Sequence, residues 1–162
     1  MGKCVEDFAI GDVSESPART VTETDIVMYS WISGDSNPMH TDAEYARRSP
    51  LGQRIAHGTL GMSIVTGLSA RMGDFDGTAI AALGVDEWQF LAPILIGDTV
   101  RLRTTVRSAK VTSKPDRGVV VRLMELVNQD DTVVQRGLMK TMAYTRAGLA
   151  GQAAPVPEPA AN

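Results

Sequence analysis

The chain has 162 residues, 43% of them hydrophobic, which is enough to bury one core but short for two. Its 16 Lys and Arg against 19 Asp and Glu give a net charge of -3, without a basic block that would favour nucleic acid as a partner. Cys4 is the single cysteine, too few for a disulfide framework or a thiolate metal site. No stretch approaches the roughly 20 apolar residues needed to cross a bilayer. We therefore expect one cytoplasmic domain that binds neither nucleic acid nor membranes.

Two capping patterns predict two short helices in the first third of the chain. Thr22 followed by Asp25 is an N-cap threonine with an acidic residue three positions later, and predicts a helix that ends at Gly34. Thr41 followed by Glu44 repeats this pattern and predicts a helix from Asp42 to about Arg48, with Asp42 as an acid in its first turn, which the following Ser-Pro ends. Residues 35–40 between them are expected to form a loop.

A third helix is predicted over residues 58–72. Leu60, Ile64, Leu68 and Met72 recur at a spacing of four, which makes one apolar stripe along a helix of about four turns. The remaining positions are mostly glycine, serine, threonine and alanine, several of which have low helix propensity. Packing must therefore hold this helix, and small side chains indicate that something wraps it closely.

The second half of the chain has strand character over residues 80–90, 99–108, 118–127 and 132–144, which are rich in Val, Leu and Thr with partial alternation. Residues 128–131 form a turn between the last two. Long consecutive strands with short links favour an antiparallel meander, and its buried face needs a cover, for which the small-residue helix is the candidate. Residues 148–162 are mostly Ala, Gly and Pro and predict a disordered tail. The fold class is α+β, with one domain over residues 1–147.

One motif carries most of the functional information. Residues 34–42 read Gly-Asp-Ser-Asn-Pro-Met-His-Thr-Asp, and Ala-His-Gly follows at residues 56–58. This pattern resembles the (R)-specific enoyl-CoA hydratases and MaoC-like dehydratases, which share the hot-dog fold. Residues 83–90 and 97–100 also look like the family's strand, turn and strand, so the resemblance covers residues 5–146. It implies a hot-dog domain whose helix at residues 58–72 is wrapped by a five- or six-stranded antiparallel sheet. It also implies a homodimer or dimer of dimers, with subunits paired edge to edge.

Asp35 and His40 are the candidate catalytic residues. They flank a loop stiffened by Pro38, which can turn a carboxylate and an imidazole toward one point. Hydration of an enoyl group needs a proton taken from water and a proton given to carbon, and these two groups suit the transfers. Either of them could protonate the carbon. The resemblance implies that both hold and activate the water. It further implies a reversible reaction between a trans-2-enoyl thioester and its (3R)-3-hydroxyacyl thioester, carried on coenzyme A or acyl carrier protein, without a metal or other cofactor.

Four further residues are candidates for binding the substrate. Gly58 opens the third helix, where a backbone N–H can stabilise an oxyanion, and the resemblance assigns it that role. His57 is expected to orient the turn at Gly58 or to contact the acyl chain. Thr66 lies two turns further on, where hydratases of the family often carry a serine that contacts the site. Asn37 is expected to fix the loop through side-chain bonds to the backbone.

Two alternatives use the same fold. A thioesterase is disfavoured because such sites usually place Asp or Glu on the central helix, and residues 58–72 contain neither. A non-catalytic acyl-binding subunit, or one half of a heterodimer, is disfavoured because Asp35 and His40 are both present. A zinc site is disfavoured because neither a His-Glu-x-x-His motif nor a cysteine set accompanies the two histidines.

Overall fold

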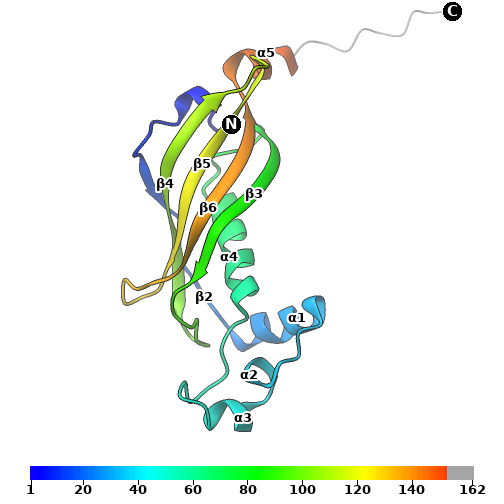
Figure 1. Ribbon diagram of the computed structural model, residues 1–162, viewed down its shortest axis with the longest axis vertical. Helices are drawn as coiled ribbons and strands as arrows, with labels where there is room; N and C mark the ends of the chain where they lie inside the picture. The colour runs from blue at the N-terminus through cyan, green and yellow to red at the C-terminus, as the bar shows by residue number, and fades with distance from the viewer. Residues whose placement is uncertain (153–162) are drawn as a thin grey trace, which may run out of the picture.

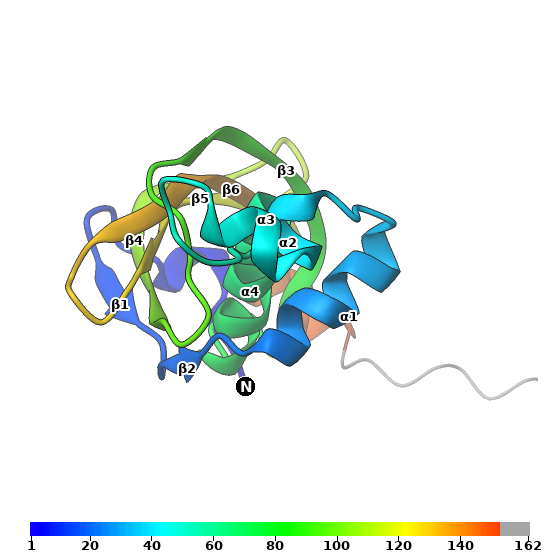
Figure 2. The ribbon, with the colours of Figure 1, turned by 90° about the horizontal axis from the view of Figure 1, so that it is seen from below.

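The computed structural model describes residues 1–152 as a curved antiparallel sheet wrapped around one long helix (Figure 1). The long helix is α4 (Gly58–Arg71), and three short helices lie together at one end of the sheet: α1 (Glu23–Ser33), α2 (Pro38–Thr41) and α3 (Ala43–Arg47). Viewed from that end, the strands curl around α4 (Figure 2). A sheet wrapped around a central helix is the hot-dog arrangement, so the predicted fold class and the central helix are confirmed.

The sheet has six strands. They are β1 (Val13–Glu15), β2 (Arg19–Thr20), β3 (Ala79–Phe90), β4 (Thr99–Val111), β5 (Arg117–Val127) and β6 (Val133–Tyr144). The four long strands agree with the predicted ranges. Strands β1 and β2 were not predicted, because strands of two or three residues are too short to show alternation in the sequence.

The order of the strands corrects the predicted meander. The sheet runs β1-β4-β5-β6-β3, with β2 also paired to β4, so β3 pairs with β6 and not with its neighbour in sequence, β4. The connection between β3 and β4 is anchored to the segment ahead of α4, where the Ala56 N–H donates to the Ile94 carbonyl at 2.9 Å. This hydrogen bond holds the connection beside the start of α4 before β4 begins. As a result, β3 and β4 do not lie next to each other.

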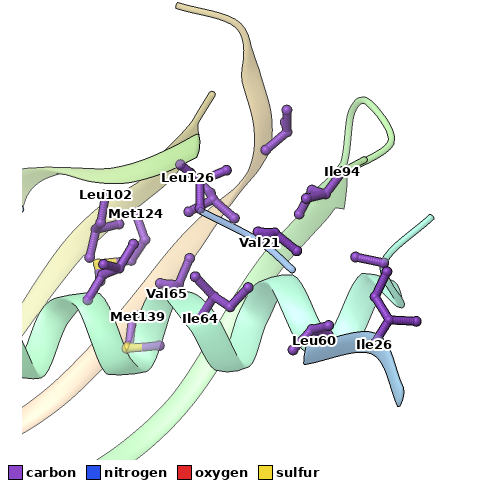
Figure 3. Close-up of a cluster of buried hydrophobic side chains, with 14 residues drawn as sticks. Val21, Ile26, Leu60, Ile64, Val65, Ile94, Leu102, Met124, Leu126 and Met139 are labelled. Atoms are coloured by element: carbon purple, nitrogen blue, oxygen red, sulfur yellow. The ribbon is translucent and has the colours of Figure 1, made fainter. Parts of the chain in front are cut away.

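The core lies between α4 and the concave face of the sheet (Figure 3). Ile64, Val65 and Leu68 of α4 are at most 4% exposed, and they belong to the same buried cluster as fully buried Met124 and Leu126 of β5. Along β5 the residues alternate between buried and half-buried, which is the pattern of a strand with one face on the core. Burial of the apolar stripe thus holds α4 despite its low helix propensity.

The helices before α4 confirm one predicted capping signal and correct two details. Thr22 caps α1 as predicted, whereas α3 begins one residue later than predicted, with Asp42 and not Thr41 as its cap; the Asp42 carboxylate accepts from the Tyr45 N–H at 2.9 Å. Residues 38–41, expected as loop, form the short helix α2. Pro38 stands at its first position, where proline suits a helix start, and Asn37 caps it by accepting from the Met39 N–H at 2.9 Å.

The end of the domain also differs from prediction. After β6 the chain continues into α5 (Arg146–Gln152), past the predicted boundary at residue 147. The Gly148 N–H donates to Thr145 Oγ1 at 3.1 Å, and Gly148 is buried against the Asp116 carbonyl. Residues 148–152 of the predicted tail are therefore helical, and residues 153–162 lie outside the described residues. A 3-10 turn, η1 (Val5–Asp7), lies near the other terminus. Within the described range, no helix combines the length and apolarity needed to span a membrane.

Candidate active site

A cleft of about 530 Å³ opens where the short helices meet the start of α4 and the end of β3. Its lining comes from four parts of the chain: Asp35 and His40 from the α1–α2 region, residues 55–59 around the start of α4, residues 90–94 at and after the end of β3, and Gln135 on β6. Four of the six predicted site residues line this cleft: Asp35, His40, His57 and Gly58.

Asp35 is held in a defined turn directly after α1. The helix ends at Gly34, whose φ of 73° is the left-handed conformation that favours glycine at a C-cap. One carboxylate oxygen of Asp35 accepts from the Asn37 N–H at 3.1 Å, and the Asp35 N–H donates to Ser33 Oγ at 3.2 Å. Asp35 is exposed, so its carboxylate is hydrated and open to the cleft.

His40 lies on α2, and one hydrogen bond determines which of its ring nitrogens carries the proton. Its Nδ1 lies 2.8 Å from the Ile55 carbonyl oxygen. A carbonyl can only accept, so Nδ1 carries the proton and Nε2 of the neutral ring is a proton acceptor. The same bond ties α2 to the segment before α4. His40 is therefore a fixed imidazole with a free basic nitrogen at the cleft.

His57 is the N-cap residue of α4 and is only 1% exposed. Its Nε2 lies 3.0 Å from the Asp35 carbonyl oxygen and 3.3 Å from Ser30 Oγ. Its ring stands 3.8 Å from the His40 ring between centroids. The Nδ1 atom is buried without a hydrogen-bond partner among the described residues. His57 thus joins α1, the Asp35 turn and α4, which supports the expected orienting role.

Gly58 is the first residue of α4. The first-turn N–H groups of a helix have no acceptor within it, and the helix dipole adds partial positive charge there. The Phe90 ring lies directly over this residue: a Cβ on Gly58 would stand 2.8 Å from Phe90 Cε1. Glycine therefore lets the Phe90 ring pack directly on the backbone at the start of α4, where the Gly58 N–H has no acceptor within the helix.

Two predicted residues lie outside the cleft lining. Thr66 is exposed on α4, and its hydroxyl donates to the Ser63 carbonyl at 2.7 Å. Asn37 is also exposed and acts as the cap of α2, in agreement with its expected loop-fixing role. Conversely, Phe90 and Gln135 line the cleft, although neither was selected from the sequence. A glutamine within an apolar strand was the one available signal for a buried polar contact.

The charged and basic groups of the cleft converge. Asp35, His40 and His57 can each offer one atom such that all three atoms lie within 4.8 Å of one another. A carboxylate and an imidazole at this separation can hold one water molecule between them and exchange protons with it. The same atoms could surround a metal ion, since each of the three side chains is a possible ligand. The free N–H at Gly58 adds a donor for a developing negative charge.

Comparison with known proteins agrees with this arrangement. The MaoC like domain model matches residues 7–128. Protein MaoC of Klebsiella aerogenes is 35% identical over 109 residues, which is 67% of this chain but 32% of that protein. The (R)-specific enoyl-CoA hydratase of Rhodospirillum rubrum is 34% identical over 105 residues, covering 62% of this chain and 67% of the hydratase. The chain thus spans about a third of the length of the first relative and about two thirds of the second.

A solved structure supports the same assignment. The MaoC-like dehydratase from Rhodospirillum rubrum superimposes with a TM-score of 0.80 and 30% identity, covering 90% of this chain and 99% of that one. The family model alone matches well over half of the chain. The chain therefore belongs to the MaoC-like domain family.

Proposed function

We propose that the protein is a hydro-lyase that interconverts a trans-2-enoyl thioester and the (3R)-3-hydroxyacyl thioester. The observation that carries the proposal is the convergence of the Asp35 carboxylate and the His40 imidazole at one cleft, beside the free N–H of Gly58. Relatives named as an (R)-specific enoyl-CoA hydratase and a 3-hydroxybutyryl-CoA dehydratase support the same reaction class. The thioester is carried on coenzyme A or on acyl carrier protein.

In the hydration direction, a water molecule lies between Asp35 and His40. One of these groups takes a proton from the water as its oxygen attacks the β-carbon. The electron pair of the carbon–carbon double bond then moves toward the thioester, and the α-carbon receives a proton from the acid–base pair. His40 suits the basic role because its Nδ1 is tied to the Ile55 carbonyl, which leaves Nε2 free to accept.

Negative charge develops on the thioester oxygen as an enolate-like transition state forms. In the proposed complex this oxygen accepts a hydrogen bond from the Gly58 N–H, aided by the positive end of the α4 dipole. A donor fixed before the reaction stabilises this charge without reorganising, and loss of such a donor typically costs about 10²–10³ in rate. The buried His57 ring bonds to the Asp35 carbonyl and so holds the Asp35 turn and the start of α4 in fixed relative positions.

The test is a hydration assay with a short enoyl-CoA, monitored through loss of the enoyl absorbance. Asp35→Asn and His40→Ala should each lower kcat by about 10²–10⁴-fold, because each removes one partner of the proton transfers. Asp12→Asn, a change of the same kind at an exposed residue away from the cleft, is the control and should leave the rate unchanged. Chiral analysis of the product should give the (3R) hydroxyacyl thioester. Full activity in both cleft variants would contradict the proposed roles.

The same assay separates the alternatives. Release of free thiol from an acyl-CoA, without formation of a hydroxyacyl product, would indicate a thioesterase. A pure chain that is inactive until a second protein is added would indicate a partner subunit.

We further propose that the reaction needs no metal or other cofactor, although Asp35, His40 and His57 could surround an ion. The hydrogen bond from the Gly58 N–H to the thioester oxygen supplies the stabilisation that a Lewis acid would give. Activity should therefore survive dialysis against a chelator. Loss of activity on chelation, with recovery on adding a divalent cation, would instead identify the three residues as a metal site.

We also propose that the protein acts as a homodimer, paired through the edge strand β3. This strand ends the sheet opposite short β1, and it exposes Leu83, Val85 and Phe90 by 39–57%. On α1, Trp31 is 86% exposed and Ile32 is 78% exposed. Long apolar edges favour association with another strand, so a second copy would cover them. Light scattering on the pure chain should give twice the monomer mass; a monomeric mass would overturn this proposal.

A further inference from the structure

The cleft contains a buried carboxamide that the proposed chemistry does not use. Gln135 lies on β6, is 2% exposed, and lines the same cleft as Asp35 and His40. Burial of a polar side chain is costly unless its hydrogen bonds are satisfied, so the partners of Gln135 matter.

Gln135 bonds to the first turn of α4 on one side and to β3 on the other. Its Nε2 donates to the Gly58 carbonyl oxygen at 3.0 Å, and its Oε1 accepts from Trp88 Nε1 at 3.2 Å. The orientation of the carboxamide follows from the partners: a carbonyl can only accept, and an indole N–H can only donate. Gln135 is therefore a two-sided brace between the sheet and the residue that opens α4.

The surrounding glycines make room for this brace. Gly61 lies one turn after Gly58, and a Cβ there would stand 2.1 Å from Gln135 Nε2. Gly137 lies beneath Trp88, and a Cβ there would stand 2.4 Å from Trp88 Cε3. Neither the carboxamide nor the indole could hold its position if these two residues had side chains. Close packing on both sides keeps Gln135 in one place.

We propose that Gln135 is a positioning residue for the oxyanion donor. Gly58 is a glycine at the first helical position, so its backbone has more freedom than that of Thr59 or Leu60, which follow it. The bond from Gln135 fixes the peptide plane on the carboxyl side of Gly58. The Gly58 N–H lies in the preceding peptide plane, and holding the following plane limits rotation about the two backbone bonds of Gly58 that join them. This restraint keeps the N–H directed into the cleft, where it meets the thioester oxygen. The inference rests on the proposed hydration reaction.

The test replaces Gln135 with a side chain of the same shape whose donor can be switched by pH. In Gln135→Glu, the ionised carboxylate can still accept from Trp88 but cannot donate to the Gly58 carbonyl, which it repels. At neutral pH or above, kcat should fall by about 10- to 100-fold, with a much smaller change in KM, because the lost interaction acts on the transition state. Gln89→Glu on neighbouring β3 is the matched control: Gln89 is exposed and accepts from Arg136, and its change should leave kcat unaltered.

A pH titration of the variant separates positioning from general damage to the fold. As the pH is lowered, the carboxyl of Gln135→Glu becomes protonated and can again donate to the Gly58 carbonyl; burial moves this transition above the ordinary value of about 4.3. The ratio of variant to wild-type kcat should therefore rise toward one as the pH falls to about 5. A ratio that does not change with pH would overturn the proposal.

Trp88→Phe provides a second variant that does not alter Gln135 itself. It removes the indole N–H while keeping a ring over Gly137, so the carboxamide loses one of its two restraints. Its kcat should fall by several-fold with KM nearly unchanged. A folded Gln135→Glu protein with wild-type kcat, or an unaffected kcat in Trp88→Phe if the glutamate variant does not fold, would refute the proposal. If the proposed hydration reaction is wrong, the wild-type chain itself will be inactive in the assay. The Gln135 proposal is refuted only when the wild type is active, so the two failures are distinguishable.

Discussion

Gly61→Ala is expected to destabilise the protein, although alanine is the best helix former and Gly61 lies in the middle of a helix. A Cβ at residue 61 would stand 2.1 Å from Nε2, 2.6 Å from Cδ and 2.7 Å from Oε1 of Gln135. No carboxamide can remain at these distances, so Gln135 must leave its place. When it moves, it breaks its bonds to the Gly58 carbonyl and the Trp88 indole.

The size of the effect follows from these contacts. Each lost hydrogen bond costs about 1 kcal/mol, and leaving a buried partner unsatisfied adds about 1–3 kcal/mol. Against this, replacing glycine by alanine in a helix interior contributes about 1 kcal/mol of stability. With two bonds lost, the net loss for Gly61→Ala is therefore about 2–4 kcal/mol. For a domain of this size, each kcal/mol lowers Tm by roughly 2–4 °C.

Gly67→Ala on the same helix is the control. A Cβ at Gly67 meets nothing within 4 Å, so only the gain in helix propensity acts there. This variant should be more stable than the wild type by about 0.5–1 kcal/mol. Thermal or urea unfolding, followed by circular dichroism at one protein concentration, measures both variants.

The two glycine variants should thus change stability in opposite directions. The double variant Gly61→Ala with Gln135→Ala extends the comparison, because alanine at 61 should stabilise once the carboxamide is absent. If Gly61→Ala proves as stable as Gly67→Ala, Gln135 does not occupy the place described, and the brace on Gly58 loses its basis.

Three further expectations concern single side chains. Thr66→Val should leave kcat and KM of the hydration assay unchanged, because the Thr66 hydroxyl is bonded to the Ser63 carbonyl outside the cleft; a large loss of activity would contradict this placement. Although burial acts to raise the pKa of Asp25, bonds from the Thr22 backbone and the Arg19 guanidinium lower it below the ordinary 3.8. The stability this carboxylate contributes is therefore complete above about pH 4 and is lost as the pH falls through the lowered pKa. Asp25→Asn should cost about 1 kcal/mol in urea unfolding at pH 7 and little at pH 2, and an equal cost at both pH values would contradict the reasoning. Burial raises the pKa of the Cys4 thiol, which is 5% exposed, so a thiol reagent should modify it slowly in the folded protein and rapidly in urea; equal rates would show that the amino-terminal segment is open.

The sequence alone was sufficient for the features that depend on neighbouring residues. Capping patterns at Thr22 and Thr41 marked two helix starts, the second one residue ahead of the cap at Asp42, and the four-residue spacing of Leu60, Ile64 and Leu68 predicted the helix at the centre of the fold. Strand ranges followed from local composition in the same way. The motif around Asp35 and His40 located the cleft through family resemblance, since a motif of fixed spacing is a local feature.

Other features depended on which distant segments lie together. Local alternation shows that residues 79–90 form a strand, but it does not select a partner, and the structure pairs β3 with β6. The stacking of His57 on His40 requires α2 and α4 to meet, and the bond from Gln135 to Gly58 joins residues 77 positions apart. Such contacts form only when the sheet closes around α4, because the strand order and the glycine gaps decide which side chains reach the cleft. The sequence thus determined the candidate acid–base pair and the helices beside it, whereas the tertiary structure alone decided which side chain bonds to the first residue of α4.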